Sequence, residues 1–189
     1  MPTPVADDLN PGQLLAPHAA PTLVRRLADH TALGSIVFSG AIFGFFYAWV
    51  CSTMWGLDDA DPRVAIEAMQ AMNASVRNAV FFPAFFLTPV VLAIAAVLLR
   101  ATQRVGAARW FFGAALVYFA GGLVLTMALN VPMNADLADV VVPASAADAQ
   151  EIWDDYSGRW QVYNVTRTVA SGVALLLAAV GLRRSRESE

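Results

Sequence analysis

W-D-D-Y-S-G-R-W-Q-V-Y-N-V-T-R, from Trp153 to Arg167, is the stretch that decides the fold, and an apolar run from Val169 to Leu182 follows it. At about 100° per residue, a helix would collect aromatic and polar side chains of this region on one face. They are Trp153, Tyr156, Trp160, Asn164, Arg167 and Ser171. A bilayer requires about 20 apolar residues, so the spanning helix must begin near Val162. Asn164 and Arg167 are therefore expected inside the membrane.

Arg167 is the most informative residue of this stripe. An arginine inside the membrane costs about 2.5 to 3.5 kcal/mol on insertion scales, so its side chain should face a polar partner or a wet cavity rather than lipid. We expect Asn130, Asn134 or an acidic residue among its partners. This face is the first candidate for a functional site.

The composition places the whole chain in the membrane class. Hydrophobic residues make up 58% of it and charged residues 14%, against about 25% charged in a typical soluble domain. Four apolar stretches are long enough to span a bilayer. They run from Thr31 to Trp55, Asn78 to Leu99, Trp110 to Leu129 and Val162 to Leu182. We predict an all-α fold, an integral membrane antiparallel four-helix bundle with a short extracytoplasmic amphipathic helix.

Arginine is concentrated in three segments that an antiparallel bundle places on one side of the membrane. These segments contain Arg25, Arg26, Arg100, Arg104, Arg109, Arg183, Arg184 and Arg186. The two other connections hold most of the acidic residues, from Asp58 to Glu67 and from Asp136 to Asp155. Because cytoplasmic segments carry the excess of Lys and Arg, we expect a multi-pass protein of the cell inner or plasma membrane with both termini in the cytoplasm.

The expected organisation has three parts. Residues 1–30 form a disordered or loosely attached cytoplasmic arm, residues 31–182 the four-span membrane domain, and residues 183–189 a basic cytoplasmic tail. Five of the ten prolines lie in residues 1–22, where little periodicity is found. The chain opens without a basic segment or an early apolar run, so the first helix is expected to insert as its own signal.

Cysteine and histidine usage limits the possible chemistry. Cys51 is the single cysteine, which excludes an internal disulfide and a multi-cysteine metal site. Both histidines, His18 and His30, precede the first span, so a bis-histidine haem within the bundle is not available. No glycine-rich phosphate loop is found. We expect no cofactor, no metal and no nucleic-acid partner, and chemistry performed by Asn, Arg, Tyr, Trp, Met and acidic side chains.

The first acidic connection predicts a short outer helix. Asp61 is placed as an N-cap and Pro62 at the first helical position. One apolar side would carry Met69, with Met72 or Asn73 one turn later. This helix either covers the mouth of the bundle as a lid or rests on the membrane surface.

Glycines and prolines modify the first two spans. Gly40 and Gly44 form a G-x-x-x-G spacing that allows close helix approach, within the bundle or between protomers of a homo-oligomer. Pro83 and Pro89 each free the carbonyl four residues earlier, so the second span should kink, for packing or to make room for a ligand.

The third span runs into the segment N-V-P-M-N. Pro132 is expected to stop the helix there. Asn130 and Asn134 would then bind the freed carbonyls or present their amides to a ligand at the depth of Asn164. The helix that leads into the last span is expected to start at about Ala146.

Two motifs carry a family resemblance, V-P-M-N from Val131 to Asn134 and the set Trp160, Asn164 and Arg167. With them the chain resembles the anthrone oxygenase-like family, small four-span membrane proteins that are mostly bacterial and of unknown function. The resemblance covers about Thr31 to Leu182. Many members of the family carry histidine where this chain has Asn164, and an amide cannot act as a general base at neutral pH.

The resemblance implies oxidation of an anthrone-like, planar phenolic polyketide by O2 without a recognised metal or flavin. A protein with this activity must bind a flat aromatic ring system, stabilise its anion and admit oxygen. Arg167 would stabilise the oxyanion, and Tyr156 or Asp155 would relay the proton. The other expected roles are ring stacking by Trp153 and Trp160, orientation by Asn130, Asn134 and Asn164, and lining of the pocket by side chains near Met69 and Asn73.

Two other interpretations remain open at this point. The stripe could be structural, with Arg167 bound to carbonyls at the end of the third span. The protein could also be non-catalytic, binding a small molecule or lipid or serving as an accessory subunit of a membrane complex. An enzyme requires a pocket at the outer end of the bundle, whereas an accessory subunit requires an exposed polar or small-residue face.

Overall fold

The structure, a computed structural model, describes residues 22–187, and those residues are almost entirely helical. Greek α marks α-helices and η marks π-helices. In chain order they are α1 (Thr22–Ala48), η2 (Trp49–Thr53), α2 (Met54–Asp58), α3 (Pro62–Ser75), α4 (Phe81–Ala101), α5 (Val105–Tyr118), η3 (Phe119–Val124), η4 (Thr126–Asn130), α6 (Val131–Ala138) and α7 (Ala146–Glu187). The described residues contain no strand.

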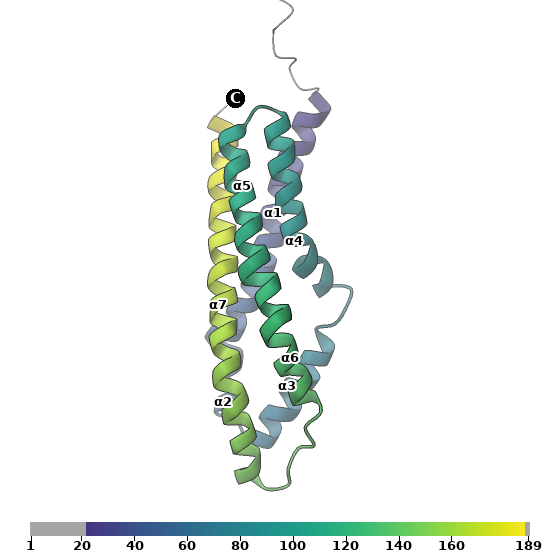
Figure 1. Ribbon diagram of the computed structural model, residues 1–189, viewed down its shortest axis with the longest axis vertical. Coiled ribbons are helices and arrows are strands. Elements are labelled where there is room, and N and C mark those ends of the chain that lie inside the picture. The colour runs from purple at the N-terminus through teal and green to yellow at the C-terminus, as the bar shows by residue number, and fades with distance from the viewer. Residues whose placement is uncertain (1–21, 188–189) are drawn as a thin grey trace, which may run out of the picture.

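The helices form one antiparallel bundle (Figure 1). Helix α1 packs on α4 and α7, and α5 packs on the same two helices, so the four long segments close a ring. The start of α1, the α4–α5 turn and the end of α7 lie at one end of the molecule, which we call the terminal half. Helices α2, α3, α6 and the start of α7 lie at the other end, the pocket half. The predicted all-α helical bundle is confirmed.

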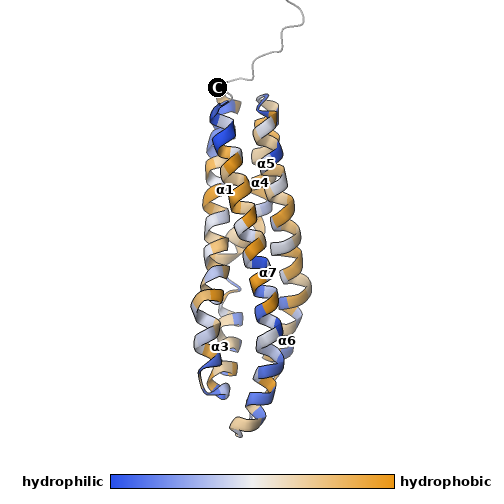
Figure 2. Cartoon of the chain, turned by 90° about the vertical axis from the view of Figure 1, so that its left-hand side faces the viewer, coloured by the Kyte–Doolittle hydropathy of each residue, from blue (hydrophilic) through white to orange (hydrophobic). Residues whose placement is uncertain are grey.

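Four continuous helical segments are long and apolar enough to cross a membrane. They are Thr22–Asp58, Phe81–Ala101, Val105–Ala138 and Ala146–Glu187. The ribbon is mostly apolar in the terminal half except at its outermost turns, whereas hydrophilic residues are frequent around α3, α6 and the start of α7 (Figure 2). The 42 residues of α7 extend over about 63 Å, twice the thickness of a typical hydrocarbon core. The chain is therefore a multi-pass membrane protein, and α7 is long enough to reach beyond the bilayer.

The terminal half is held by close contacts between small residues and rings. A methyl group added at Gly181 of α7 would lie 2.8 Å from the Phe111 ring and 3.1 Å from Trp110 Cβ. At Gly121 in η3 it would lie 2.5 Å from Ala170 Cβ. Gly40 and Gly44, by contrast, have no atom within 4 Å of such a methyl group. The G-x-x-x-G spacing is therefore not used for packing within the described chain, and the predicted homo-oligomer contact stays a prediction.

Pro89 inside α4 has a specific partner in the third segment. A proline at this position cannot donate to the carbonyl of Phe85, four residues earlier. The Tyr118 hydroxyl donates to that carbonyl at 2.9 Å, although it lies on α5. The proline thus fixes where α4 and α5 meet. The Phe85 carbonyl that Pro89 leaves without an intrahelical donor is thus bound by Tyr118 and is not available to a ligand.

The third segment differs from the prediction at Pro132. The helix does not stop there, because α6 follows η4 directly and places Pro132 in its first turn. A proline is tolerated in the first turn of a helix, where its missing N–H has no intrahelical acceptor. The π-helical turns η3 and η4 precede α6 and change the hydrogen-bond register. Pro132 can therefore lie in the first turn of α6 while the chain continues as a helix.

Helix α3 lies against α7, α6 and α2 in the pocket half. Its predicted N-cap is confirmed, since the Asp61 carboxylate accepts from the Arg63 N–H at 3.0 Å with Pro62 at the first position. The Gln70 side chain donates to the carbonyls of Leu137 and Val140, at the end of α6. The apolar side of α3 is buried within the protein, which favours a cover over the bundle instead of a helix on the membrane surface.

Helix α1 begins at Thr22, so residues 22–30 belong to a helix and only residues 1–21 of the expected arm lie outside the described residues. The predicted basic tail begins within α7, which ends at Glu187. The restart of the helix near Ala146 is confirmed.

Candidate functional site

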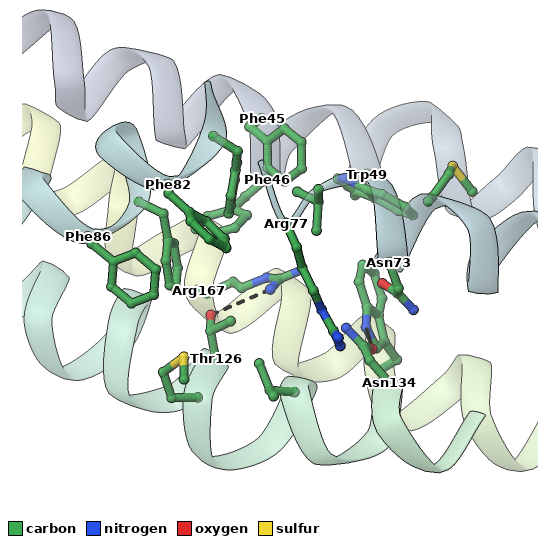
Figure 3. A pocket seen from close by; sticks show the side chains of 17 residues that line it. Phe45, Phe46, Trp49, Asn73, Arg77, Phe82, Phe86, Thr126, Asn134 and Arg167 are labelled. Carbon is green, nitrogen blue, oxygen red and sulfur yellow. Dashed lines mark hydrogen bonds between the residues drawn. The ribbon is translucent and has the colours of Figure 1, made fainter. Parts of the chain in front are cut away.

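A cavity of about 310 Å³ lies between the segments of the pocket half (Figure 3). Its wall is mainly aromatic and apolar, with a few amides and two arginines. The lining residues are Phe45, Phe46, Trp49, Met72, Asn73, Val76, Arg77, Phe81, Phe82, Phe85, Phe86, Thr126, Met127, Val131, Asn134, Trp160 and Arg167. A mostly apolar cavity with few polar groups of fixed position is typical of a small-molecule site.

Arg167 lies near the middle of α7, and only 5% of it is exposed. Its Nε donates to Asn164 Oδ1 at 2.9 Å and its Nη1 to Thr126 Oγ1 at 3.5 Å. The guanidinium carbon is 4.4 Å from the centre of the Phe46 ring and 5.0 Å from that of Trp160. The expected interior position is confirmed. Its partners are Asn164 and Thr126, not the expected Asn130, Asn134 or an acidic residue.

The remaining nitrogen, Nη2, makes no hydrogen bond to another residue in the described part of the chain. Arg167 lines the cavity, so this side of the guanidinium faces the space that a ligand would occupy. The cation is held in place by Asn164, Thr126 and two rings, without neutralisation by a carboxylate. A site of this kind favours an anionic or strongly polar oxygen on a bound ligand.

Asn134 connects the cavity to the aromatic stripe of α7. Its Oδ1 accepts from the Tyr156 hydroxyl at 2.8 Å and from Trp160 Nε1 at 2.9 Å. Asn73 of α3 donates to the same Tyr156 oxygen at 3.4 Å. Asn73, Asn134 and Trp160 line the cavity, whereas Tyr156 stands behind the two amides. The structure thus brings together four residues that the sequence predicted for the site.

Other predicted residues lie outside the lining. Trp153 donates from Nε1 to Asp58 Oδ1 at 2.9 Å and so ties α7 to the end of α2. Met69 is fully buried in the apolar cluster under α3. Asp155 is exposed and paired with Arg159 at 2.6 Å. Trp153 and Met69 support the site through packing, and Asp155 points away from it.

Asn164 and Asn130 also lie outside the cavity lining, but only Asn164 is hydrogen-bonded. Asn164 accepts from Arg167 and donates to the Phe46 carbonyl at 3.4 Å, so it positions the arginine. Asn130 is fully buried, and neither its Oδ1 nor its Nδ2 has a hydrogen-bond partner. The expectation that Asn130 binds freed carbonyls of the third span is therefore wrong.

Much of the cavity wall was not predicted. The start of α4 contributes Phe81, Phe82, Phe85 and Phe86, a segment that reads from the sequence as ordinary apolar span. Phe81 and Phe85 stack with ring centres 5.4 Å apart. Arg77, just before α4, was missed as well. The available signal is the unusual density of phenylalanine from residue 81 to 86, shortly after an arginine and an asparagine.

Within residues 22–187, no cluster of three or more His, Cys, Asp or Glu side chains has an arrangement that could hold a metal ion. The cavity lining described here contains neither histidine nor carboxylate. Its ionisable groups are the two arginines. Any acid–base step within the cavity would therefore depend on water or on Tyr156 behind the amides.

The fold and the cavity define a class: a multi-pass helical membrane protein with an aromatic pocket that contains a buried cation. A family model described as anthrone oxygenase matches residues 72–177, more than half of the chain. The chain belongs to the anthrone oxygenase family. The match runs from the last residues of α3 into α7 and includes Arg77, Asn134 and Arg167, whereas α1, η2 and α2 lie before it. No curated protein and no solved structure matches the chain.

Proposed function

We propose that the protein is a membrane oxygenase that oxidises a planar phenolic, anthrone-like substrate with O2 and without a cofactor. The observation that carries this proposal is the Arg167 guanidinium, which faces an aromatic cavity with Nη2 unengaged. The family membership supports it.

The reaction needs little from the protein because the substrate is its own electron source. Loss of a proton from the ring methylene carbon gives an anthrolate, whose negative charge lies mainly on oxygen. The anion passes one electron to O2, and the carbon radical and superoxide combine to form a C–O bond. Protonation gives a hydroperoxide, which loses water to form the quinone. In total, anthrone and O2 give anthraquinone and water, so the carbon is oxidised and O2 is reduced.

Arg167 would lower the barrier by stabilising the anthrolate oxygen, which carries more charge after proton loss than before it. Asn164 would hold the guanidinium in place, because its Oδ1 accepts from Nε and it lies outside the cavity lining. Phe46, Trp160 and the α4 phenylalanines would take the faces of the rings. Asn134 and Asn73 would orient the substrate, and Tyr156 would relay the proton.

The test is turnover of an anthrone by purified protein in detergent or lipid discs, followed by quinone absorbance above the spontaneous rate. Removal of a donor that stabilises an oxyanion costs about 10²- to 10³-fold in rate, so Arg167→Ala should lose activity to that extent. Asn164→Ala should lose less, because the arginine remains. Arg159→Ala is the matched control, since Arg159 is exposed and does not line the cavity.

If wild-type protein does not exceed the spontaneous rate, the oxygenase proposal fails for that substrate. If Arg167→Ala is folded and as active as wild type, the guanidinium has a structural role only. The alternative function is non-catalytic binding of a small molecule or lipid, or service as an accessory subunit. Arg167 Nε and Nη1 both donate to residues of the protein, which favours a structural role for this arginine. Ligand binding without turnover would support the non-catalytic alternative.

A further inference from the structure

The cavity contains a second cation that the proposed reaction does not use. Arg77 lies between α3 and α4 and lines the same cavity as Arg167. Its side chain reaches across the cavity past the Arg167 guanidinium toward Asn134 (Figure 3). No carboxylate belongs to the cavity lining found among residues 22–187. Two positive groups therefore face one ligand space without an opposite charge.

Arg77 differs from the other arginines of the pocket half. Arg63 is paired with Asp61 at 2.6 Å, and Arg159 is paired with Asp155 at 2.6 Å. No side-chain hydrogen bond or ion pair is found for Arg77 with any residue of the described range 22–187. Acidic side chains are frequent in this half, yet Arg77 is directed over the cavity and not toward one of them. An arginine so placed is available to an anion that enters the cavity.

We propose that the ligand of this pocket is an aromatic compound with two acidic groups, in which Arg167 takes a phenol-type oxygen and Arg77 binds a carboxylate at the mouth. The proposal rests on the proposed function for the role of Arg167 and adds the substrate class. Arg77 is thereby a residue that determines specificity, because it contacts the part of the ligand that does not react.

The chemistry of the two positions differs in the way that this assignment requires. Arg167 is buried and has one unengaged nitrogen, which suits a single oxygen. Arg77 is exposed, and its planar guanidinium can present two parallel N–H donors to a carboxylate. A carboxylate at the mouth stays partly hydrated, so its desolvation costs little compared with a charge deep in the pocket. The apolar ring system between them would occupy the phenylalanine wall.

The experiment compares two probes of nearly the same shape, anthraquinone-2-carboxylate and 2-methylanthraquinone. Binding to purified wild-type protein is followed by quenching of tryptophan fluorescence, since Trp49 and Trp160 line the cavity. A charge-assisted hydrogen bond should give the carboxylate probe an advantage of about tenfold or more. Arg77→Gln should remove this advantage and leave the methyl probe unaffected. Arg77→Lys should retain part of it, because the charge remains and the paired donors are lost.

Arg159→Gln is the control for a general change of charge, and it should keep the wild-type preference. Equal binding of both probes to wild type, a preserved preference in Arg77→Gln, or no saturable binding of the carboxylate probe would each overturn the proposal. The outcome is separate from the test of oxygenation. A carboxylate preference without anthrone turnover would refute the oxygenase and leave the Arg77 assignment in place. Anthrone turnover without a carboxylate preference would refute the Arg77 assignment and leave the oxygenase proposal in place.

Discussion

The helices of the terminal half pack through small residues, whereas those of the pocket half pack through large side chains. The terminal half is built from alanine and apolar rings, and its helices approach closely at glycines such as Gly181. The pocket half is built from large side chains, among them Trp153, Tyr156 and Trp160. Its segments are connected by side-chain hydrogen bonds, and the first and third segments contain π-helical turns.

The difference shows what a cavity requires in a membrane protein. Lipid is as apolar as a helix surface, so helices associate through close packing and hydrogen bonds rather than through the hydrophobic effect. Close packing of small residues gives stability but leaves no room for a ligand. Large side chains leave gaps, and the hydrogen bonds of Asn134 and Asp58 then keep those gaps in a defined shape. We infer that stability resides mainly in the terminal half and selectivity in the pocket half.

The largest expected effect tests the terminal half. Gly181→Val should lower the free energy of unfolding by about 1 to 3 kcal/mol, because its methyl groups would collide with the Phe111 ring, which is fully buried. Denaturant unfolding in detergent measures this loss. Ligand binding per folded molecule should remain unchanged, because Gly181 is distant from the cavity in the chain and does not line it.

Gly40→Val is the matched control, since no atom lies within 4 Å of a methyl group at that position. It should leave stability near the wild-type value. If Gly40→Val destabilises as much as Gly181→Val, the Gly40 face is covered by a second copy of the chain, which would support the predicted homo-oligomer. A large loss of binding in Gly181→Val would break the division between the halves.

The sequence predicts most of the fold because the relevant signals are local. Span length and composition identify the four membrane segments, and the spacing of Asp61 and Pro62 marks the start of α3. The helical period places the stripe correctly, since all of its members are buried on α7. Pro132 was misread because its effect depends on the π-helical turns before it, and such a register change has no recognised sequence signature here.

An intermediate effect tests the pocket half. Asn134→Leu removes the acceptor shared by the Tyr156 hydroxyl and Trp160 Nε1, which leaves two donors without a partner. In membrane proteins such bonds are worth about 0.6 to 2 kcal/mol, so the loss of stability should be about 1 to 2 kcal/mol. The free energy of binding of the quinone probes should decrease by more than the free energy of unfolding, because Asn134 also lines the cavity.

The matched control for this variant is Asn78→Leu, which removes an amide outside the Arg167 cavity. It should leave probe binding at the wild-type level, even if the turn before α4 is weakened. If Asn134→Leu binds the probes as tightly as wild type, the Tyr156–Asn134–Trp160 connection does not shape the site. The difference proposed between the halves would then rest on the arginines alone.

The candidate site could be predicted only in part, and the reason is physical. A helical period identifies which face of one helix is buried, so Trp160, Asn164 and Arg167 were found. It does not identify which residues of another helix lie opposite, and the α4 phenylalanines and Arg77 were therefore missed. The sequence predicts Asn164 as a ligand contact, whereas in the structure it accepts from Arg167 and lies outside the cavity lining, a distinction that requires the positions of both side chains.

The smallest expected effect concerns the cap of α3, which covers the pocket half. Hydrogen bonds from the Arg63 side chain and backbone lower the pKa of Asp61 from its usual 3.8 to about 2. A carboxyl whose pKa is lowered on folding contributes stability that is complete above pH 4 and disappears as the pH falls through about 2. Protection of the first turn of α3 against amide exchange should therefore be constant from pH 4 upward and decrease below it. Asp61→Asn keeps a good N-cap but loses the charge, so its protection should lack this decrease. An equal decrease in both proteins would assign the acid sensitivity to another group.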